Sequence, residues 1–155
     1  MRRAVAADLP AIAALQREAY AALTARIGRR PMPVDADFGG LLETMEIWIV
    51  DGERGLDAVL ILDPKEDHLL IWSIAVAERR KGQGLGRDLL AFAERRAAGA
   101  GAGIVRLFTN ERFTENLAWY ARQGYAVERV ENFEERRIVA SLQTRAIARE
   151  YEFFL

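Results

Sequence analysis

The sequence predicts a mixed α/β fold in which antiparallel strands come first and a parallel strand pair follows. Apolar runs between turn signals fill residues 47–76, and a strand, a glycine-rich turn, a helix and another strand succeed one another over 69–109. Alanine-rich stretches at 4–25 and 91–102 have helical spacing. With 155 residues, 51% hydrophobic and 29% charged, the chain has the size and composition of one globular domain, which we expect over 1–155.

The N-terminal part predicts two helices. Asp8 is placed to cap a helix whose apolar residues recur every three or four positions. Gly28 ends this helix, and Pro31 and Pro33 prevent its continuation because they lack an amide hydrogen. A second, short helix is predicted over 37–44.

Three strands are predicted next. They cover 47–50, 58–62 and 69–76, with Asp-Gly and Asp-Pro turn signals between them. The simplest arrangement is an antiparallel meander. The third run is apolar on both faces, so we expect it to be central and covered by helices.

The apolar period becomes helical after Gly86, and a further strand is predicted over 104–109. Together with the strand over 69–76, this series forms one right-handed parallel crossover.

The C-terminal part predicts a short helix over 114–123, ended by Gly124, and a strand over 125–130. Two segments, 137–142 and 149–154, compete for the last strand. We favour the first, as the return arm of a hairpin.

Composition excludes several kinds of site. The chain has no cysteine and a single histidine, His68, so thiolate zinc sites, a cysteine nucleophile and multi-histidine metal sites are all excluded. We expect no metal. The formal net charge of −1 argues against coating nucleic acid phosphates, and no apolar run is long enough for a membrane-spanning helix. We expect neither partner, and the lack of a signal-peptide pattern predicts a cytoplasmic protein.

The most informative segment lies between the third strand and the helix after it. Its residues are Lys81, Gly82, Gln83, Gly84, Leu85 and Gly86. Glycines allow a sharp turn and a close approach to a ligand, and the N-terminus of a helix presents unpaired amide hydrogens to an anion. Cations at positions 79, 80, 81 and 87 flank this turn. The segment therefore predicts an anion site, although its spacing matches neither a P-loop nor a dinucleotide fingerprint.

This spacing resembles motif A of the GNAT (GCN5-related) N-acetyltransferases, Q/R-x-x-G-x-G/A, with Lys81 in place of the usual glutamine or arginine. A second family segment, Asn-x-x-x-Tyr ahead of a Gly-aromatic pair, is similar to Asn116, Tyr120 and the pair Gly124-Tyr125. The element order agrees until about residue 140, as in small bacterial-type members. The resemblance implies a GNAT fold, with antiparallel N-terminal strands, a central parallel pair splayed around a coenzyme A cleft, and helices on both faces.

The resemblance also implies acetyl-CoA as cosubstrate. Its pyrophosphate would lie on the loop amides, and its pantetheine arm would pair with the backbone of the third strand. The implied cofactor-binding residues are Ile74, Ala75, Val76, Lys81, Gly82, Gln83, Gly84, Leu85, Gly86, Asn116 and Tyr120. Asn116 and Tyr120 are four residues apart and so share a helix face. Tyr120 would be the catalytic general acid, because a tyrosine with a pKa of about 10 stays protonated at neutral pH. A capping role for Asn116 and a packing role for Tyr120 are the structural alternatives.

The implied activity is transfer of the acetyl group to a primary amine of a small molecule or peptide. Without cysteine, direct attack in a ternary complex is the simplest mechanism. Asp37, Phe38 and Trp72 would shape the amine pocket. Trp72 stands where related members often carry a carboxylate, so the general base stays open.

Four residues could supply that base through water: Glu43, Glu46, Asp37 and His68. The missing carboxylate also leaves an alternative function, a non-catalytic acetyl-CoA or CoA sensor with the same fold. The apolar C-terminal stretch 147–155 predicts a partner surface or a homodimer contact. The acceptor amine cannot be derived from these residues.

Overall fold

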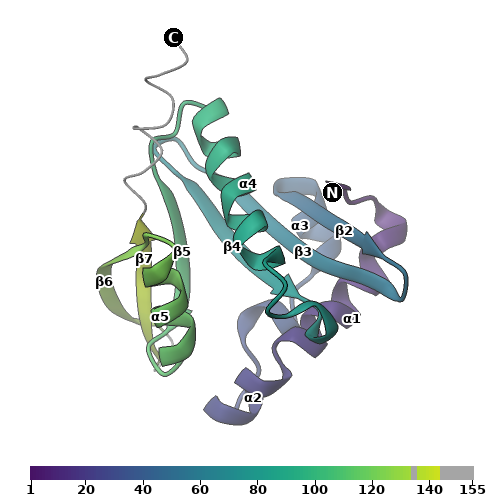
Figure 1. The fold of residues 1–155 in the computed structure, drawn as a ribbon, viewed down its shortest axis with the longest axis horizontal. Coiled ribbons are helices and arrows are strands. Elements are labelled where there is room, and N and C mark those ends of the chain that lie inside the picture. The colour runs from purple at the N-terminus through teal and green to yellow at the C-terminus, as the bar shows by residue number, and fades with distance from the viewer. Residues whose placement is uncertain (134–135, 144–155) are drawn as a thin grey trace. The chain divides into compact units, whose positions relative to one another are not determined.

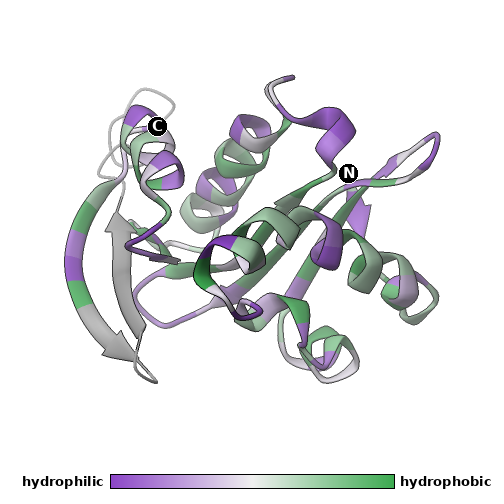
Figure 2. Cartoon of the chain, turned by 90° about the horizontal axis from the view of Figure 1, so that it is seen from below, coloured by the Kyte–Doolittle hydropathy of each residue, from purple (hydrophilic) through white to green (hydrophobic). Residues whose placement is uncertain are grey.

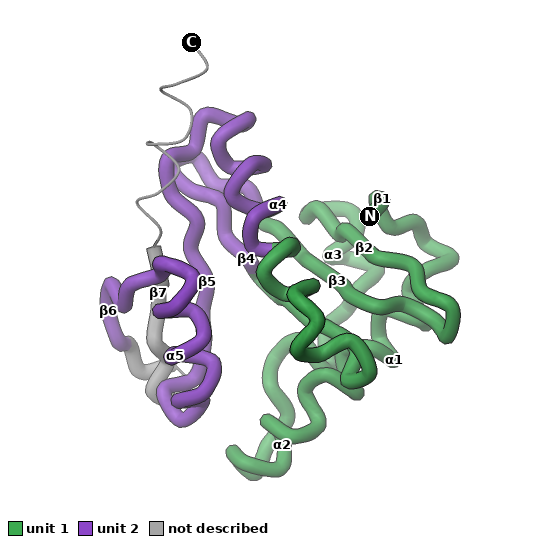
Figure 3. Tube along the Cα trace, viewed as in Figure 1, with its two compact units in different colours: residues 1–63, 72–89 green, residues 64–71, 90–155 purple. Residues whose placement is uncertain are grey.

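The computed structural model describes the backbone of residues 1–133 and 136–143 (Figure 1). The chain divides into two compact units (Figure 3). Unit 1 comprises residues 1–63 and 72–89, and unit 2 comprises residues 64–71 and 90–155. Strand β4 (Leu69–Val76) and helix α4 (Leu85–Gly99) each run from one unit into the other. A single domain over 1–155 stays a prediction.

Unit 1 is built from antiparallel strands and short helices. Its elements are β1 (Arg2–Arg3), η1 (Ala6–Asp8), α1 (Leu9–Ala19), α2 (Ala21–Ile27), η2 (Met32–Val34), α3 (Phe38–Thr44), β2 (Glu46–Gly52), β3 (Gly55–Pro64, whose last residue belongs to unit 2) and η3 (Glu78–Arg80). The strand order is β1-β2-β3-β4, with β2 antiparallel to both β1 and β3. The predicted antiparallel pairing of the first two strands is confirmed as β2 and β3, and β4 lies beside β3. Strand β1 is a short addition that the sequence did not indicate.

The core of unit 1 lies on one face of its strands. Ile47 pairs with Ile61 across β2 and β3, and both side chains are fully buried. Ile12 from α1 and Phe38 from α3 belong to the same hydrophobic cluster. Each such aliphatic or aromatic side chain contributes about 1.5–3 kcal/mol when it is fully buried. Residues of β3 on the opposite face, such as Leu60, are also fully buried.

The predicted first helix is interrupted. Tyr20, with φ −97° and ψ 3°, separates α1 from α2, and Gly28 ends α2 in the left-handed conformation, as predicted. The helical period contains no signal for this break, which coincides with a tertiary contact between the Tyr20 hydroxyl and Ser73. Asp8 precedes α1 but makes no capping bond, since its carboxylate accepts the backbone N–H of Val5 instead.

Unit 2 holds the parallel strand pair and a C-terminal hairpin. Its further elements are β5 (Val105–Asn110), α5 (Thr114–Arg122), β6 (Ala126–Phe133) and β7 (Arg136–Gln143). The strand order is β4-β5-β7-β6. The parallel ladder pairs Leu69 with Val105 and Ile71 with Leu107. The parallel pair is therefore confirmed, whereas its splaying further along β4 and β5 stays a prediction.

The last predicted strand, 137–142, is confirmed as β7, which lies between β5 and β6 and is antiparallel to both. The competing segment 149–154 and the apolar stretch 147–155 lie outside the described residues. Hydrophilic colour appears on β6 as well as on the helices, which carry both colours (Figure 2). None of the helices in the described ranges is long and apolar enough to cross a membrane.

Asp8 generates a test of pH-dependent stability. Hydrogen bonds from Arg2 and from the Val5 amide lower the pKa of Asp8 from 3.8 to about 2. The ionised carboxylate therefore stabilises the fold above pH 3.8, and this contribution is lost as the pH falls through about 2. We expect Asp8→Asn to unfold at a lower temperature than wild type at pH 7, with the gap closing between pH 4 and pH 2.

The matched control is Asp35→Asn, which breaks an exposed ion pair with Arg30. Surface ion pairs of this kind contribute little to stability, so the free energy of unfolding should change by less than about 1 kcal/mol. If the difference in unfolding temperature between Asp8→Asn and wild type were the same at pH 7 and at pH 2, ionisation of Asp8 would not be what stabilises the fold.

Candidate active site

The second half of β4 leads into the predicted anion loop. Ile74 and Val76 are partly exposed and Ala75 is buried. The 3-10 turn η3 follows, and Gly82 and Gly84 then take positive φ values of 74° and 86°. A side chain in this left-handed region is strained, which explains why the loop needs glycine. Helix α4 begins immediately afterwards.

The loop leaves backbone donors unpaired. Among the residues that the structure describes, none accepts a hydrogen bond from the amides of Gly82, Gly84, Leu85 or Gly86. The first helical bond into α4 runs from the Asp88 amide to the Gly84 carbonyl, at 3.1 Å. These amides are the unsatisfied donors of a helix N-terminus, where the helix dipole favours negative charge.

Two of the predicted loop amides are already engaged. The amide of Lys81 donates to the Glu78 carbonyl at 3.2 Å, and that of Gln83 donates to the Arg80 carbonyl at 3.4 Å. These bonds shape the turn. Four of the six amides in the predicted run 81–86 therefore lack an acceptor among the described residues.

The cations around the loop are mostly paired, which corrects the expectation that all four supply charge to the opening. Arg79 and Arg80 both bind Asp57, and the Lys81 ammonium lies 2.5 Å from a Glu78 carboxylate oxygen. Arg87 has no carboxylate partner within the described ranges.

The predicted pocket residues take different places in unit 1. Phe38 is 7% exposed and belongs to the core cluster, and Trp72 is partly buried and packs against that cluster. Asp37 is exposed, and its carboxylate caps α3 by accepting the Gly39 amide at 3.2 Å. The structure thus brings Phe38 and Trp72 to one cluster, and a pocket role for the three stays a prediction.

A buried polar group on β4 was not predicted. Ser73 is 3% exposed and exchanges hydrogen bonds with the fully buried Gln16 side chain, at 3.0 and 3.1 Å. The hydroxyl of Tyr20 lies 3.3 Å from the same serine oxygen, and burial raises the pKa of Tyr20. Two features of the sequence could have indicated this buried pair: Gln16 lies among the apolar positions of α1, and Ser73 lies within an apolar strand.

The candidate bases mostly have other partners. A Glu46 oxygen accepts the Trp48 indole N–H at 3.0 Å and also pairs with Arg3. His68 lies in unit 2, where its Nδ1 contacts Asp67 and Arg106. Glu43 is exposed on α3, and Asp37 caps that helix. The geometry assigns the base to none of these four candidates.

Asn116 and Tyr120 both lie on α5 in unit 2. Asn116 is half-buried and is not the N-cap, which is Phe113. Tyr120 is 6% exposed, and its ring centroid lies 4.9 Å from that of Trp119 and 5.9 Å from that of Tyr125. Asn116 therefore lies in the first turn of α5, and its roles as a ligand or as a first-turn capping residue both stay predictions. The packing of Tyr120 fixes its ring.

The described residues contain no group of three or more histidine or carboxylate side chains that could hold a metal ion. Unit 1 presents a turn with unpaired backbone amides among the described residues, next to a strand end where Ile74 and Val76 are partly exposed.

A sequence profile of the acetyltransferase (GNAT) family matches residues 15–125. The chain therefore belongs to this family. The family and the fold together support an acetyl-CoA-dependent acyltransferase activity.

Solved structures share the fold at low sequence identity. The PaiA N-acetyltransferase from Thermoplasma acidophilum, in complex with coenzyme A, has a TM-score of 0.73 and 14% identity, covering 92% of this chain and 96% of that one. The ribosomal-protein-S18-alanine N-acetyltransferase from Escherichia coli has a TM-score of 0.71 and 20% identity, covering 92% and 89%. A GNAT family acetyltransferase from Elizabethkingia anophelis with acetyl-CoA bound has a TM-score of 0.61 and 21% identity, covering 74% and 90%. The comparison with curated proteins gave no match.

The positive φ of Gly82 provides a test of the loop. A Cβ at this position would meet nothing within 4 Å, so Gly82→Ala adds backbone strain without a clash. The left-handed conformation costs about 1–2 kcal/mol for alanine. We expect about a tenfold rise in the dissociation constant for coenzyme A, measured by calorimetry.

The control is Gly99→Ala at the end of α4, where a Cβ also meets nothing within 4 Å and φ is not positive. Alanine favours helix by up to about 1 kcal/mol over glycine, so stability should hold or rise and the affinity for coenzyme A should not change. Equal affinities for wild type and Gly82→Ala would show that the loop conformation does not matter for binding.

Proposed function

We propose that the protein is an N-acetyltransferase that transfers the acetyl group of acetyl-CoA directly to a primary amine of a small molecule or peptide. The observation that carries the proposal is the turn after β4, in a chain of the acetyltransferase family. Four amides of this turn have no acceptor among the residues that the structure describes. The acetyl-CoA and coenzyme A in two of the similar structures support this donor.

In this proposal the donor diphosphate accepts hydrogen bonds from Gly82, Gly84, Leu85 and Gly86, and the helix dipole of α4 adds to the attraction. Lys81 and Gln83 hold the turn through their own amide bonds. The pantetheine arm pairs with the backbone of Ile74, Ala75 and Val76. These three residues lie further along β4 than Ile71, which is the last residue paired with β5 in the described ladder.

The proposal gives Asn116 and Tyr120, both on α5, roles toward the same donor. Asn116 holds the pantetheine amide, and the Tyr120 hydroxyl gives its proton to the departing thiolate sulfur. The burial of Tyr120 and its ring contacts with Trp119 and Tyr125 restrict the orientation of the hydroxyl, which favours proton transfer.

Acetyl transfer joins the amine nitrogen to the acetyl carbonyl carbon and breaks its bond to sulfur. A backbone amide near Ala75 or Val76 would stabilise the oxyanion that forms on the carbonyl oxygen. The amine must lose its proton before it attacks, through a base that is not assigned. The chain contains no cysteine to carry the acetyl group, which supports direct transfer. No membrane or nucleic acid partner enters this proposal, and we propose a cytoplasmic location.

The acceptor class is open to a direct assay. Acetyl-CoA is incubated with a panel of small primary amines and, separately, of peptides with free N-terminal amines, and the released thiol is measured. The name of the Escherichia coli relative, a ribosomal-protein-alanine acetyltransferase, supports including the peptides. Release above the rate without amine identifies the class.

The second candidate function is a non-catalytic sensor of acetyl-CoA or coenzyme A. Trp72, at a position where related members often carry a carboxylate, is the observation that favours it. Saturable binding of acetyl-CoA with no thiol release across both panels would replace the enzyme with the sensor. Absence of any coenzyme A binding would remove both.

The role of Tyr120 is tested by Tyr120→Phe, which keeps the ring contacts and deletes the hydroxyl. General acids contribute about 10²–10⁴-fold, so we expect kcat to fall by about 10² or more while the dissociation constant for coenzyme A stays within about twofold. Tyr125→Phe is the matched control, because it deletes the hydroxyl of the neighbouring buried ring. An unchanged kcat for Tyr120→Phe would assign Tyr120 to packing.

A further inference from the structure

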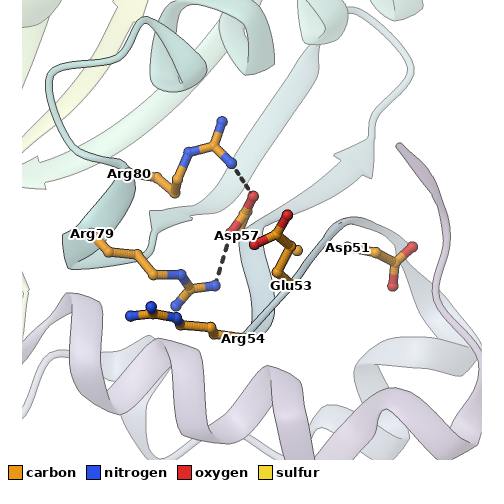
Figure 4. A pocket seen from close by; sticks show the side chains of 7 residues that line it. Asp51, Glu53, Arg54, Asp57, Arg79 and Arg80 are labelled. Carbon is orange, nitrogen blue, oxygen red and sulfur yellow. Dashed lines mark hydrogen bonds and ion pairs between the residues drawn. The ribbon is translucent and has the colours of Figure 1, made fainter.

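One ion-pair cluster of unit 1 is not used by the proposed chemistry. Asp57 lies on β3, is 4% exposed, and stands between the buried apolar residues Leu56 and Ala58. One carboxylate oxygen accepts Arg79 Nη2 at 2.8 Å, and the other accepts Arg80 Nη1. Figure 4 shows both guanidinium groups turned toward Asp57. The cluster lines a cavity of about 620 Å³ beside the β2–β3 hairpin.

The hairpin is built around this carboxylate. Arg79 Nη2 also donates to the carbonyl oxygens of Gly55, at 3.2 Å, and Leu56, at 3.0 Å. A Cβ at Gly52 would lie 2.2 Å from the Asp57 carboxylate, so only glycine leaves room for it. The Asp57 carbonyl also accepts the Ala77 amide at 2.9 Å, at the end of β4.

The same bonds continue into the anion loop. Arg80 Nε donates to the Gln83 side-chain oxygen at 2.9 Å, and the Gln83 side-chain nitrogen donates back to the Arg79 carbonyl at 2.9 Å. Gln83 lies between Gly82 and Gly84, whose amides are unpaired. A continuous set of hydrogen bonds therefore joins a buried carboxylate on β3 to the turn that presents the amides.

The pairing of charges in this cluster bears on whether the arginines or the backbone amides bind an anion. Arginine is a strong phosphate ligand, but both guanidinium groups here are directed to one buried carboxylate. Breaking a buried pair from one side is costly because it leaves a charge without its partner. The arginines therefore stay with Asp57, and the backbone amides are left to bind the anion.

We propose that Asp57 is a positioning residue for the anion loop: through Arg79, Arg80 and Gln83 it fixes the turn whose amides bind the donor diphosphate. This inference rests on the proposed function, since it assigns a second role to the same coenzyme A site. It concerns the affinity for the donor, and the transfer step does not require it.

The test compares calorimetric titrations of wild type, Asp57→Asn, Arg80→Gln and the double variant with coenzyme A. Each single variant is expected to raise the dissociation constant about tenfold. The double variant should raise it no further, because both substitutions break the same connection. If Asp57→Asn does not fold, Arg80→Gln carries the test, since the Arg80 side chain is 39% exposed and Asp57 keeps Arg79.

Ile47→Val is the control for lost stability. Ile47 is fully buried on β2, and its replacement costs about 0.5–1.5 kcal/mol without touching the cluster. The affinity of Ile47→Val for coenzyme A should equal that of wild type. If its affinity fell as much as that of Asp57→Asn, the loss of affinity in Asp57→Asn would follow from lower stability, and the inference would fail.

Three further outcomes overturn the inference. Tighter binding by Asp57→Asn would mean that the released arginines bind the diphosphate themselves, and unchanged binding by both single variants would mean that the loop needs no anchor. Additive effects in the double variant would mean that the two residues act separately. Wild type that binds no coenzyme A would refute the proposed function as well, so the two failures are distinguishable.

Discussion

The site depends on one constraint of the backbone: the turn between β4 and α4 ends in a helix whose first amides have no partner in the described chain. Gly82 and Gly84 make the turn with positive φ, which a larger side chain adopts only at a cost. The open amides and the helix dipole together favour an anion at this point. Hydrogen bonds from Asp57 through Arg80 and Gln83 lead into this turn.

The proposal gives donor binding and chemistry to different segments of the chain. It assigns the diphosphate to the loop after β4, and it assigns the pantetheine amide and the leaving sulfur to Asn116 and Tyr120 on α5. In the proposal mostly main-chain groups hold the donor, so Lys81 in place of the usual glutamine or arginine would not disturb its binding. The acceptor would be held by side chains instead, and Trp72 stands where the family resemblance leads us to expect a carboxylate. For this reason the sequence indicates the donor, acetyl-CoA, but does not indicate which amine accepts the acetyl group.

Local patterns predicted the elements that depend on local physics. The bounds of β4 and the start of α4 follow from an apolar run and a glycine turn, and α3 begins after its capping Asp37. The break at Tyr20 and the pairing of Asp57 depend on partners more than twenty residues away, so no local period reveals them. For the same reason, the cations near the loop looked free in the sequence although three are paired. The sequence therefore did not predict the features that depend on contacts between distant residues.

The central claim is that loop amides bind the diphosphate of coenzyme A, and amide NMR tests it directly. Adding coenzyme A to ¹⁵N-labelled protein should shift the amide signals of Gly82, Gly84, Leu85 and Gly86 strongly, because their hydrogens gain an acceptor. The amides of Gly28 and Gly101, also glycines with positive φ, should hardly move. Saturable shifts elsewhere in the chain with the four loop amides unchanged would contradict the account.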